Sequence, residues 1–365
     1  MLFDPRPKDS RENLFGRDEE LEKLLSAFVS GPPLILVLGM RRLGKTSLLK
    51  VALNEYRGPY IYLDLRIFAE EGFSKVAFYR LLSEELSRVV SRWRKLKDFI
   101  AKVRGVEVAG VKVELDWGRS GVSLSSLFRA IDNAMKKENR NFVVAFDEAQ
   151  LLRFVRGGKG RIDFRSFLAY AYDNLRHVKF VLTGSEVGLL MDFIGAYDSS
   201  SPLYGRYREE IVLKKFDQTA SLDFLRQGFQ EYGMRPDKAV LEKVVDVLDG
   251  VVGWLTYYGY EAVSRWRADG EVLDKVVEEA VQITRNELEK IFTRSPLYRD
   301  VVRAVAKGSS KWNEIKQVVE AWRKVPVSNA HLSRILKGLV KLNVLEKRAD
   351  GYFLADPLTA VAVSS

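Results

Sequence analysis

One eight-residue segment constrains the fold more than any other part of the sequence. An apolar run at residues 34–38 precedes it, and an amphipathic pattern over about residues 45–56 follows. The segment matches G-x-x-x-x-G-K-[ST] at every fixed position. Its residues are Gly39, Met40, Arg41, Arg42, Leu43, Gly44, Lys45 and Thr46. A loop of this kind joins a buried strand to the start of a helix, so the sequence predicts a β-loop-α unit.

The residue types in this segment are those that phosphate binding requires. Glycines permit the backbone angles that aim successive N–H groups at phosphate oxygens, and the positive end of a helix adds to the attraction. Lys45 would reach the β and γ phosphates, and Thr46 would ligate a Mg²⁺ ion. Ser47, the next residue, is a further candidate for binding the nucleotide. The alternative is a glycine-rich turn without a ligand. We expect a loop that binds ATP or ADP with Mg²⁺.

A second strand ends in two carboxylates. Residues 141–146 are mostly apolar, and Asp147 and Glu148 follow directly. In a parallel sheet, residues at the carboxyl end of a strand lie at the ligand-binding edge. Asp147 would therefore hold magnesium, and Glu148 would polarise the attacking water as a general base. Alone the pair is a weak signal, because many strands end in an acid that caps the next helix.

Two further side chains are candidates for the catalytic set. Ser185 follows the apolar strand at residues 179–183, where a hydroxyl would approach the γ phosphate. Its alternative role is to cap a helix over residues 186–191. Arg206 is the candidate for a charge-stabilising arginine, with Arg208 as a second choice, and either could instead be an ordinary surface residue.

The order of strand and helix patterns predicts an α/β fold with three parts. Residues 1–216 alternate between apolar strands and helices, which predicts a three-layer αβα core with a parallel sheet, including a long helical stretch over about residues 74–103. Residues 217–294 contain only helical patterns and are expected to form a lid. In residues 295–365, three helices precede an alternating hairpin, which predicts a winged helix.

Composition excludes several classes of function. The sequence has no cysteine and only two histidines, His177 and His331, which makes disulfides and thiolate or zinc sites improbable. No apolar run reaches the roughly 18 residues that a membrane span needs, and the N-terminus lacks a secretory signal. We therefore expect a cytoplasmic protein without a membrane partner.

Basic charge is concentrated near the C-terminus. Residues 297–365 contain 12 Lys plus Arg against 6 Asp plus Glu, which is +6 of a net charge of +10. One helix pattern and the hairpin present a cationic face, for which we expect double-stranded DNA as the partner. Its residues are Ser328, Asn329, His331, Arg334, Lys337, Lys341, Lys347 and Arg348. A solvated face or a protein contact are the alternatives. The basic run at residues 92–97 is interpreted as an exposed helix face, not as a second DNA site.

Together, these motifs resemble the archaeal ATPase family in the STAND branch of the AAA+ P-loop NTPases. The resemblance rests on residues 15–21, 39–49, 146–150, 182–185 and 253–258 and spans residues 11 to about 360. It implies a Walker core, a helical lid and a C-terminal winged helix. It also implies that the adenine and ribose are enclosed by Asn13, Phe15, Gly16, Arg17, Gly253 and Tyr257. The sequence departs from the family at Val252, where the lid motif usually has proline.

The expected function is an ATP-dependent molecular switch in which bound nucleotide sets the position of the winged helix. Two alternatives have the same motifs. One is a protein-interaction module with structural ADP or ATP, and the other is a transcriptional regulator with negligible turnover. The sequence leaves the oligomeric state and the protein partner open.

Overall fold

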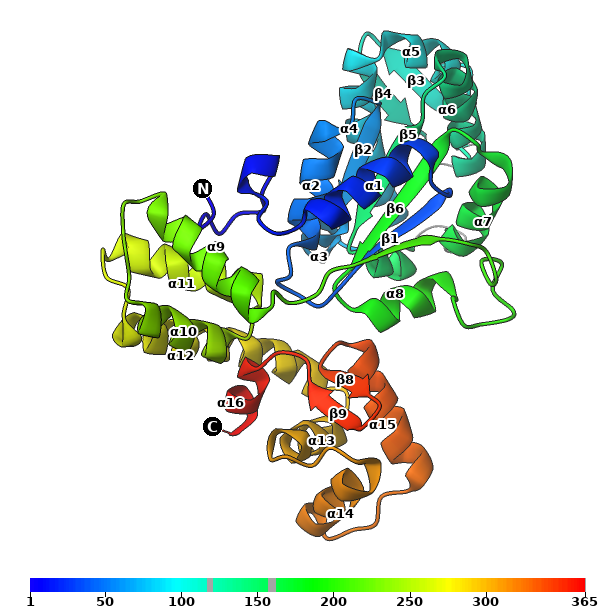
Figure 1. Ribbon diagram of the computed structural model, residues 1–365. Coiled ribbons are helices and arrows are strands. Elements are labelled where there is room, and N and C mark those ends of the chain that lie inside the picture. Colours follow the sequence, from blue (N-terminus) through cyan, green and yellow to red (C-terminus); the bar gives the residue numbers. More distant parts are fainter. Residues whose placement is uncertain (117–120, 157–161, 365) are drawn as a thin grey trace.

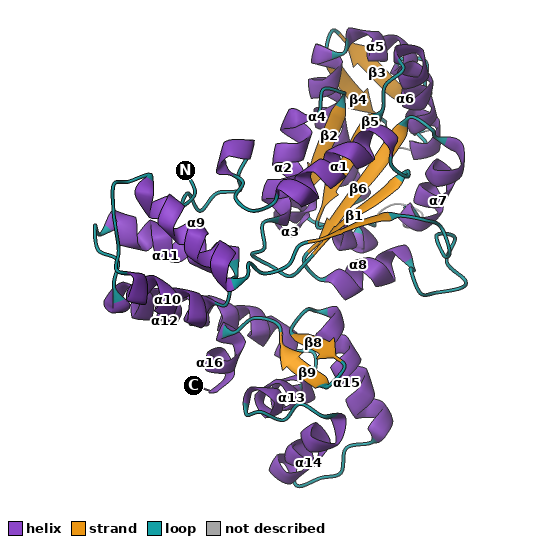
Figure 2. Cartoon of the chain, in the orientation of Figure 1, coloured by secondary structure: helices purple, strands orange, loops and turns teal. Residues whose placement is uncertain are grey.

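The computed structural model of the chain describes residues 1–116, 121–156 and 162–364. Figures 1 and 2 show an α/β core, a helical lid beside it, and a C-terminal domain below both. The core has a five-stranded parallel sheet in the order β2-β5-β6-β1-β7. The strands are β1 (Leu34–Leu38), β2 (Tyr60–Asp64), β5 (Phe142–Asp147), β6 (Val178–Gly184) and β7 (Glu209–Val212).

Helices cover both faces of this sheet. Helices α1 (Asp18–Ser30) and α2 (Lys45–Glu55) pack on one face, and α4 (Lys75–Arg92), α6 (Leu124–Glu138), α7 (Phe164–Asn174) and α8 (Val187–Ile194) pack on the other. β1, β5 and β6 are buried along their whole length, as expected for strands covered on both faces. The predicted three-layer core is confirmed.

Register brings the candidate site residues to one edge of the sheet. Asp64 lies beside Asp147 in the β2–β5 pair, and Leu38 lies beside Gly184 in the β1–β6 pair. Because all these strands are parallel, their carboxyl ends meet at the same edge. The phosphate-binding loop, the Asp147–Glu148 pair and Ser185 all follow there.

The expected helical stretch over residues 74–103 consists of two helices, α4 and α5 (Arg94–Ile100), separated at Trp93. Trp93 has φ −116° and ψ 71°, which are not helical angles, and its N–H bonds to the carbonyl of Val89. The predicted hairpin follows as β3 (Val106–Ala109) and β4 (Lys112–Leu115). The shorter segments are η1 (Arg11–Asn13), η2 (Leu65–Ile67), α3 (Phe68–Glu71) and η3 (Ala149–Phe154).

The lid consists of α9 (Gln218–Gln230), α10 (Lys238–Leu248), α11 (Val252–Ser264) and α12 (Gly270–Phe292). The N-terminal segment packs into it, since Phe3 is 1% exposed and its ring meets those of Phe224 and Phe229. Val252, which stands where the family usually has proline, is the first residue of α11. Proline is tolerated there because the first N–H groups of a helix have no intrahelical partner, so valine keeps the same backbone.

The C-terminal domain has the element order expected of a winged helix. It contains α13 (Pro296–Ala306), α14 (Trp312–Arg323), α15 (Asn329–Lys341), the hairpin strands β8 (Leu345–Arg348) and β9 (Gly351–Leu354), and a final helix α16 (Leu358–Ser364) that the sequence did not predict. The hydroxyl of Ser328 caps α15 by accepting from the N–H of His331. Among the described residues, no helix is long and apolar enough to cross a membrane.

Candidate nucleotide-binding site

The loop between β1 and α2 has the backbone conformation that the motif predicts. Gly39, Arg42 and Gly44 have φ values of 145°, 65° and 90°. Gly39 also lies close to the next strand, since a Cβ there would be 2.8 Å from the carbonyl oxygen of Leu213. Glycine is required at such a position because any side chain would collide with backbone. The loop therefore wraps around the N-terminus of α2.

Lys45 lies buried at the centre of this loop. Its side chain is 6% exposed, and its ammonium donates to the carbonyl of Met40 at 2.7 Å. Burial lowers the pKa of Lys45 to about 8, while the carboxylates of Glu148 and Asp147 act in the opposite direction. A buried ammonium with a single neutral acceptor is poorly compensated, so an incoming phosphate would stabilise it.

Asp147 is 1% exposed and is held by hydroxyl groups from three elements. Its Oδ2 accepts from Thr46 Oγ1 at 2.9 Å and from the Tyr62 hydroxyl at 2.8 Å. Its Oδ1 accepts from Thr183 Oγ1. Burial and the adjacent carboxylate raise the pKa of Tyr62, which keeps that hydroxyl a donor. The structure thus brings together Thr46 and Asp147, the two predicted magnesium ligands.

This donor set fits Mg²⁺ bound together with a nucleotide. The described residues contain no cluster of three or more His, Cys, Asp or Glu side chains that could hold a metal by themselves. Magnesium commonly binds through one or two protein oxygens, several waters and the phosphates of a substrate. Thr46 and Asp147 would supply the protein oxygens of such a shell, and the ion would neutralise charge on the β and γ phosphates.

Glu148 adopts a left-handed backbone conformation with φ 57°. Its Oε2 accepts from Gln150 Nε2 at 2.6 Å, from Ser185 Oγ at 2.9 Å and from Ser185 N–H at 3.2 Å. Ser185 does not cap α8, whose N-cap residue is Glu186. The capping role is therefore not seen, and the predicted approach of Ser185 to a γ phosphate stays a prediction.

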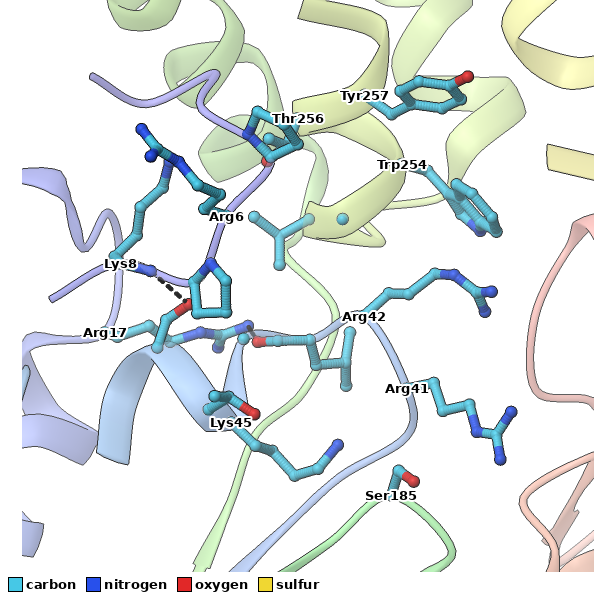
Figure 3. A pocket seen from close by; sticks show the side chains of 18 of the residues that line it. Arg6, Lys8, Arg17, Arg41, Arg42, Lys45, Ser185, Trp254, Thr256 and Tyr257 are labelled. Carbon is cyan, nitrogen blue, oxygen red and sulfur yellow. Dashed lines mark hydrogen bonds between the residues drawn. The ribbon is translucent and has the colours of Figure 1, made fainter. Parts of the chain in front are cut away.

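A cavity of about 790 Å³ lies between the loop and the lid. Figure 3 shows Lys45 and Ser185 on the core side of the cavity and Thr256 and Tyr257 on the lid side. Arg41 and Arg42 lie between them, on the phosphate-binding loop. The lid is tied to the loop directly, because the N–H of Gly253 donates to the carbonyl of Arg42 at 2.9 Å. Nucleotide bound here would contact both parts.

The predicted nucleotide-binding residues have different places around this cavity. Asn13, Phe15 and Arg17, the segment from Arg41 to Ser47, and the lid residues Gly253 and Tyr257 line it. Gly16, Gly39 and Met40 are not among the lining residues. Arg17 is 5% exposed and donates to the carbonyl of Lys214 at 2.7 Å. Its guanidinium thus holds the end of the core beside the lid.

The structure does not bring Arg206 to the site of its own chain. The guanidinium pairs with Asp173 of α7 at 2.6 Å, and Arg206 does not line the cavity. Arg208 pairs with Glu210 at 2.7 Å. The nearby carboxylates hold both arginines on the outer side of the core, which a sequence spacing does not reveal.

Several lining residues were not predicted from the sequence. Arg66 follows β2 and lies 3.9 Å from Asp147 Oδ2, while pairing with Asp64. Arg6 and Lys8, from the N-terminal segment, form part of the wall (Figure 3). Each is distant in sequence from the motifs. Only the position of Arg66 after a strand of a parallel sheet was a usable signal.

All eight residues predicted to contact DNA are exposed in the C-terminal domain. Two of them have acidic partners: Lys341 pairs with Asp192 of α8 at 2.7 Å, and Arg348 pairs with Glu346 at 2.9 Å. Within the described part of the chain, Arg334, Lys337 and Lys347 form no ion pair. The face is therefore cationic in the structure, and one of its residues contacts the core.

A phosphate-binding loop, a buried aspartate beside its threonine and an adjacent glutamate define a P-loop ATPase. Residues 14–257 match the family described as an ATPase domain predominantly from Archaea, and the chain belongs to that family. A structure of the Walker-type ATPase of Pyrococcus abyssi is 37% identical, with all of both chains covered and a TM-score of 0.84. The ORC2 protein of Aeropyrum pernix is 16% identical over 100% of this chain and 97% of that chain, with a TM-score of 0.61. No curated protein matches.

Replacing Lys45 by Ala should weaken ATP binding at least tenfold. A charged hydrogen bond is worth roughly 1.5–3 kcal/mol, and the backbone N–H groups cannot replace the lost charge. Titration calorimetry on the purified variant measures this. Lys23→Ala is the matched control, because Lys23 is on α1 and does not line the cavity. An unchanged dissociation constant for Lys45→Ala would contradict the assignment of the loop.

Glu148→Gln should retain ATP binding and lose turnover by roughly 10²- to 10⁴-fold, since the amide fills the same space without accepting a proton. Glu186→Gln is the control, because Glu186 lines the same cavity but pairs with Arg41. Release of phosphate under single-turnover conditions measures both. If Glu148→Gln hydrolyses ATP as fast as the parent, another group activates the water.

Proposed function

We propose that the chain is a Mg²⁺-dependent ATPase that works as a molecular switch, in which the bound nucleotide sets the position of the basic C-terminal domain. One observation carries this proposal. Asn343, next to the end of α15, donates through Nδ2 to the carbonyl oxygen of Ser185 at 2.8 Å. Ser185 in turn donates to Glu148. The catalytic carboxylate and the C-terminal domain are therefore two hydrogen bonds apart.

Further contacts join the same two surfaces. Lys341 pairs with Asp192 of α8. Gly188 of the same helix lies directly against Lys341, since a Cβ at Gly188 would be 2.5 Å from Lys341 Cα. These contacts are a hydrogen bond, an ion pair and the close approach of Gly188, and polar contacts between domains commonly open and close. A γ phosphate that rearranged Ser185 would therefore act on the contact with Asn343.

A second connection passes through the lid. Arg41 and Arg42 of the phosphate-binding loop both pair with Glu287 of α12, at 3.3 Å and 2.7 Å. α12 has 23 residues, which corresponds to about 35 Å, and it packs against α13 and α16 of the C-terminal domain. Trp254 of α11 also donates to Asp356 at 3.1 Å. Movement of the lid would thus be transmitted to the C-terminal domain by a rigid helix.

We propose slow turnover in this arrangement. Three donors already occupy Oε2 of Glu148, which is one of the two carboxylate oxygens that could polarise a water molecule. Removal of the two Ser185 donors would leave only Gln150 on Oε2, so opening of the C-terminal domain and activation of Glu148 would occur together.

We propose double-stranded DNA as the partner of the exposed face of α15 and the hairpin. The support is charge: Arg334, Lys337 and Lys347 project from neighbouring elements without acidic partners in the described chain. Phosphate contacts of this kind position a protein on a duplex without reading its sequence. An acidic protein surface would satisfy the same residues and becomes the leading partner if DNA binding is absent.

Arg334→Ala, Lys337→Ala and Lys347→Ala should each weaken duplex binding and reduce the slope of log K against log salt by about 0.9, because each removes one phosphate contact. Lys341→Ala is the internal contrast: Asp192 already neutralises its ammonium, so the slope should change less. Fluorescence anisotropy with the full chain and unrelated duplexes measures this, with ATP affinity as the control. No duplex affinity even at low salt would contradict the DNA proposal.

A further inference from the structure

A second cavity, of about 610 Å³, opens at the free edge of the central sheet. It shares no lining residue with the nucleotide cavity. β2 is the outermost strand there and pairs with β5 alone among the described strands. Arg92 and Trp93, the first two residues of the basic run at 92–97, line this cavity. The earlier interpretation of that run as a plain exposed helix face therefore needs revision for these two residues.

Regular spacing in three elements aims side chains at the cavity. Tyr60 and Tyr62 alternate on β2 and so share one face, while Ile61 and Leu63 are buried on the other. Lys50 of α2 lies four residues before Asn54, and Arg88 of α4 lies four residues before Arg92. Residues four apart on a helix lie on one side, so α2 and α4 form the walls.

The aromatic rings in the cavity are held in place by their polar atoms. Tyr56 donates to the carbonyl of Asn141 at 2.7 Å, Tyr60 to Asn54 Oδ1 at 3.3 Å, and Tyr62 to Asp147 at 2.8 Å. Trp93 is half-buried at the junction of α4 and α5. Lys50 Nζ lies 5.6 Å from the centre of the Tyr62 ring, and the Arg140 guanidinium lies 5.5 Å from that of Trp93. The three tyrosine rings are fixed by their hydroxyls, and planar bases stack on fixed aromatic rings at about 1–3 kcal/mol per base.

The cavity has a marked excess of positive charge. Four basic side chains line it, and the only acidic lining residue described is Glu85. Arg88 pairs with Glu85, whose pKa is raised mainly by burial. The remaining three, Lys50, Arg57 and Arg92, form no ion pair with any described residue. Lys50 lies on α2, Arg57 lies in the turn between α2 and β2, and Arg92 is the last residue of α4, so the charge comes from three parts of the cavity wall.

We propose that this cavity binds the phosphates and bases of single-stranded nucleic acid. Bases would stack on the tyrosine and tryptophan rings, and successive phosphates would meet Lys50, Arg57 and Arg92. A free nucleotide offers the same chemistry for a single base, whereas a strand can place several bases and several phosphates against these rings and cations. The site is separate from the nucleotide cavity and from the exposed face of α15, and it does not depend on the proposed switch.

Occupancy of this site would be sensed at the magnesium site. Tyr62 connects the second cavity to Asp147, because its side chain lines that cavity and its hydroxyl donates to Asp147 Oδ2. The contact gives a bound strand a direct route to the ATPase centre, through one side chain.

The test is fluorescence anisotropy of the full chain with a labelled oligothymidylate of about 12 nucleotides. Arg57→Glu combined with Arg92→Glu should raise the dissociation constant at least tenfold and reduce the log–log salt slope by roughly 1.4, since each single-strand phosphate contributes about 0.7. The matched control is Arg94→Glu with Lys95→Glu, which reverses two charges in the same run outside the cavity. The control should change affinity by less than about threefold.

Four outcomes would overturn the proposal. An equal loss in both double variants would indicate a general electrostatic field, and no loss in the cavity variant would exclude these residues. Absence of oligomer binding after Arg334→Ala and Lys337→Ala would place all of the binding in the C-terminal domain. Competition by AMP separates the two sources of the chemistry: displacement only by oligomers supports a strand, and equal displacement by AMP would overturn the proposal. Circular dichroism melting confirms that each variant is folded.

Discussion

The site depends on one buried carboxylate, Asp147, and on the hydroxyls that satisfy it. A charge removed from water is tolerated only when it is hydrogen-bonded or paired. Donors come from α2 through Thr46, from β2 through Tyr62 and from β6 through Thr183. These bonds hold the helix of the phosphate-binding loop and three strands around a single point. Magnesium can therefore meet Thr46 and Asp147 without a rearrangement of the core.

Glu148, the next carboxylate in the sequence, is held by a residue that also contacts the C-terminal domain. Asp147 is held within the core, whereas Glu148 is held by Ser185, whose carbonyl accepts from Asn343 of the C-terminal domain. Ser185, in the loop that follows β6, thus contacts both Glu148 and the C-terminal domain. The proposed switch requires no long pathway, because both domains bias the same short loop.

Local patterns predicted the loop and the strands on which the candidate site lies, because these elements are encoded within short motifs. The glycine-rich loop, the buried strand before Asp147 and the cap at Ser328 each depend on neighbours within a few residues. The contacts that the sequence did not reveal are long-range. Arg206 is held by Asp173, 33 residues earlier, and Tyr62 reaches Asp147 across 85 residues. Spacing carries no signal for such pairs. The break at Trp93 was missed because a helix pattern continues on both sides of it.

The central claim, that nucleotide state positions the C-terminal domain, is tested most directly by a distance measurement. The chain has no cysteine, so nitroxide labels at Tyr197→Cys in the core and Ala349→Cys in the hairpin would be the only ones. Tyr197 is 79% exposed, and Ala349 is also exposed. In the Glu148→Gln background, the account predicts different electron–electron distance distributions with ADP and with ATP and Mg²⁺. One unchanged distribution in the nucleotide-free, ADP and ATP states would contradict it.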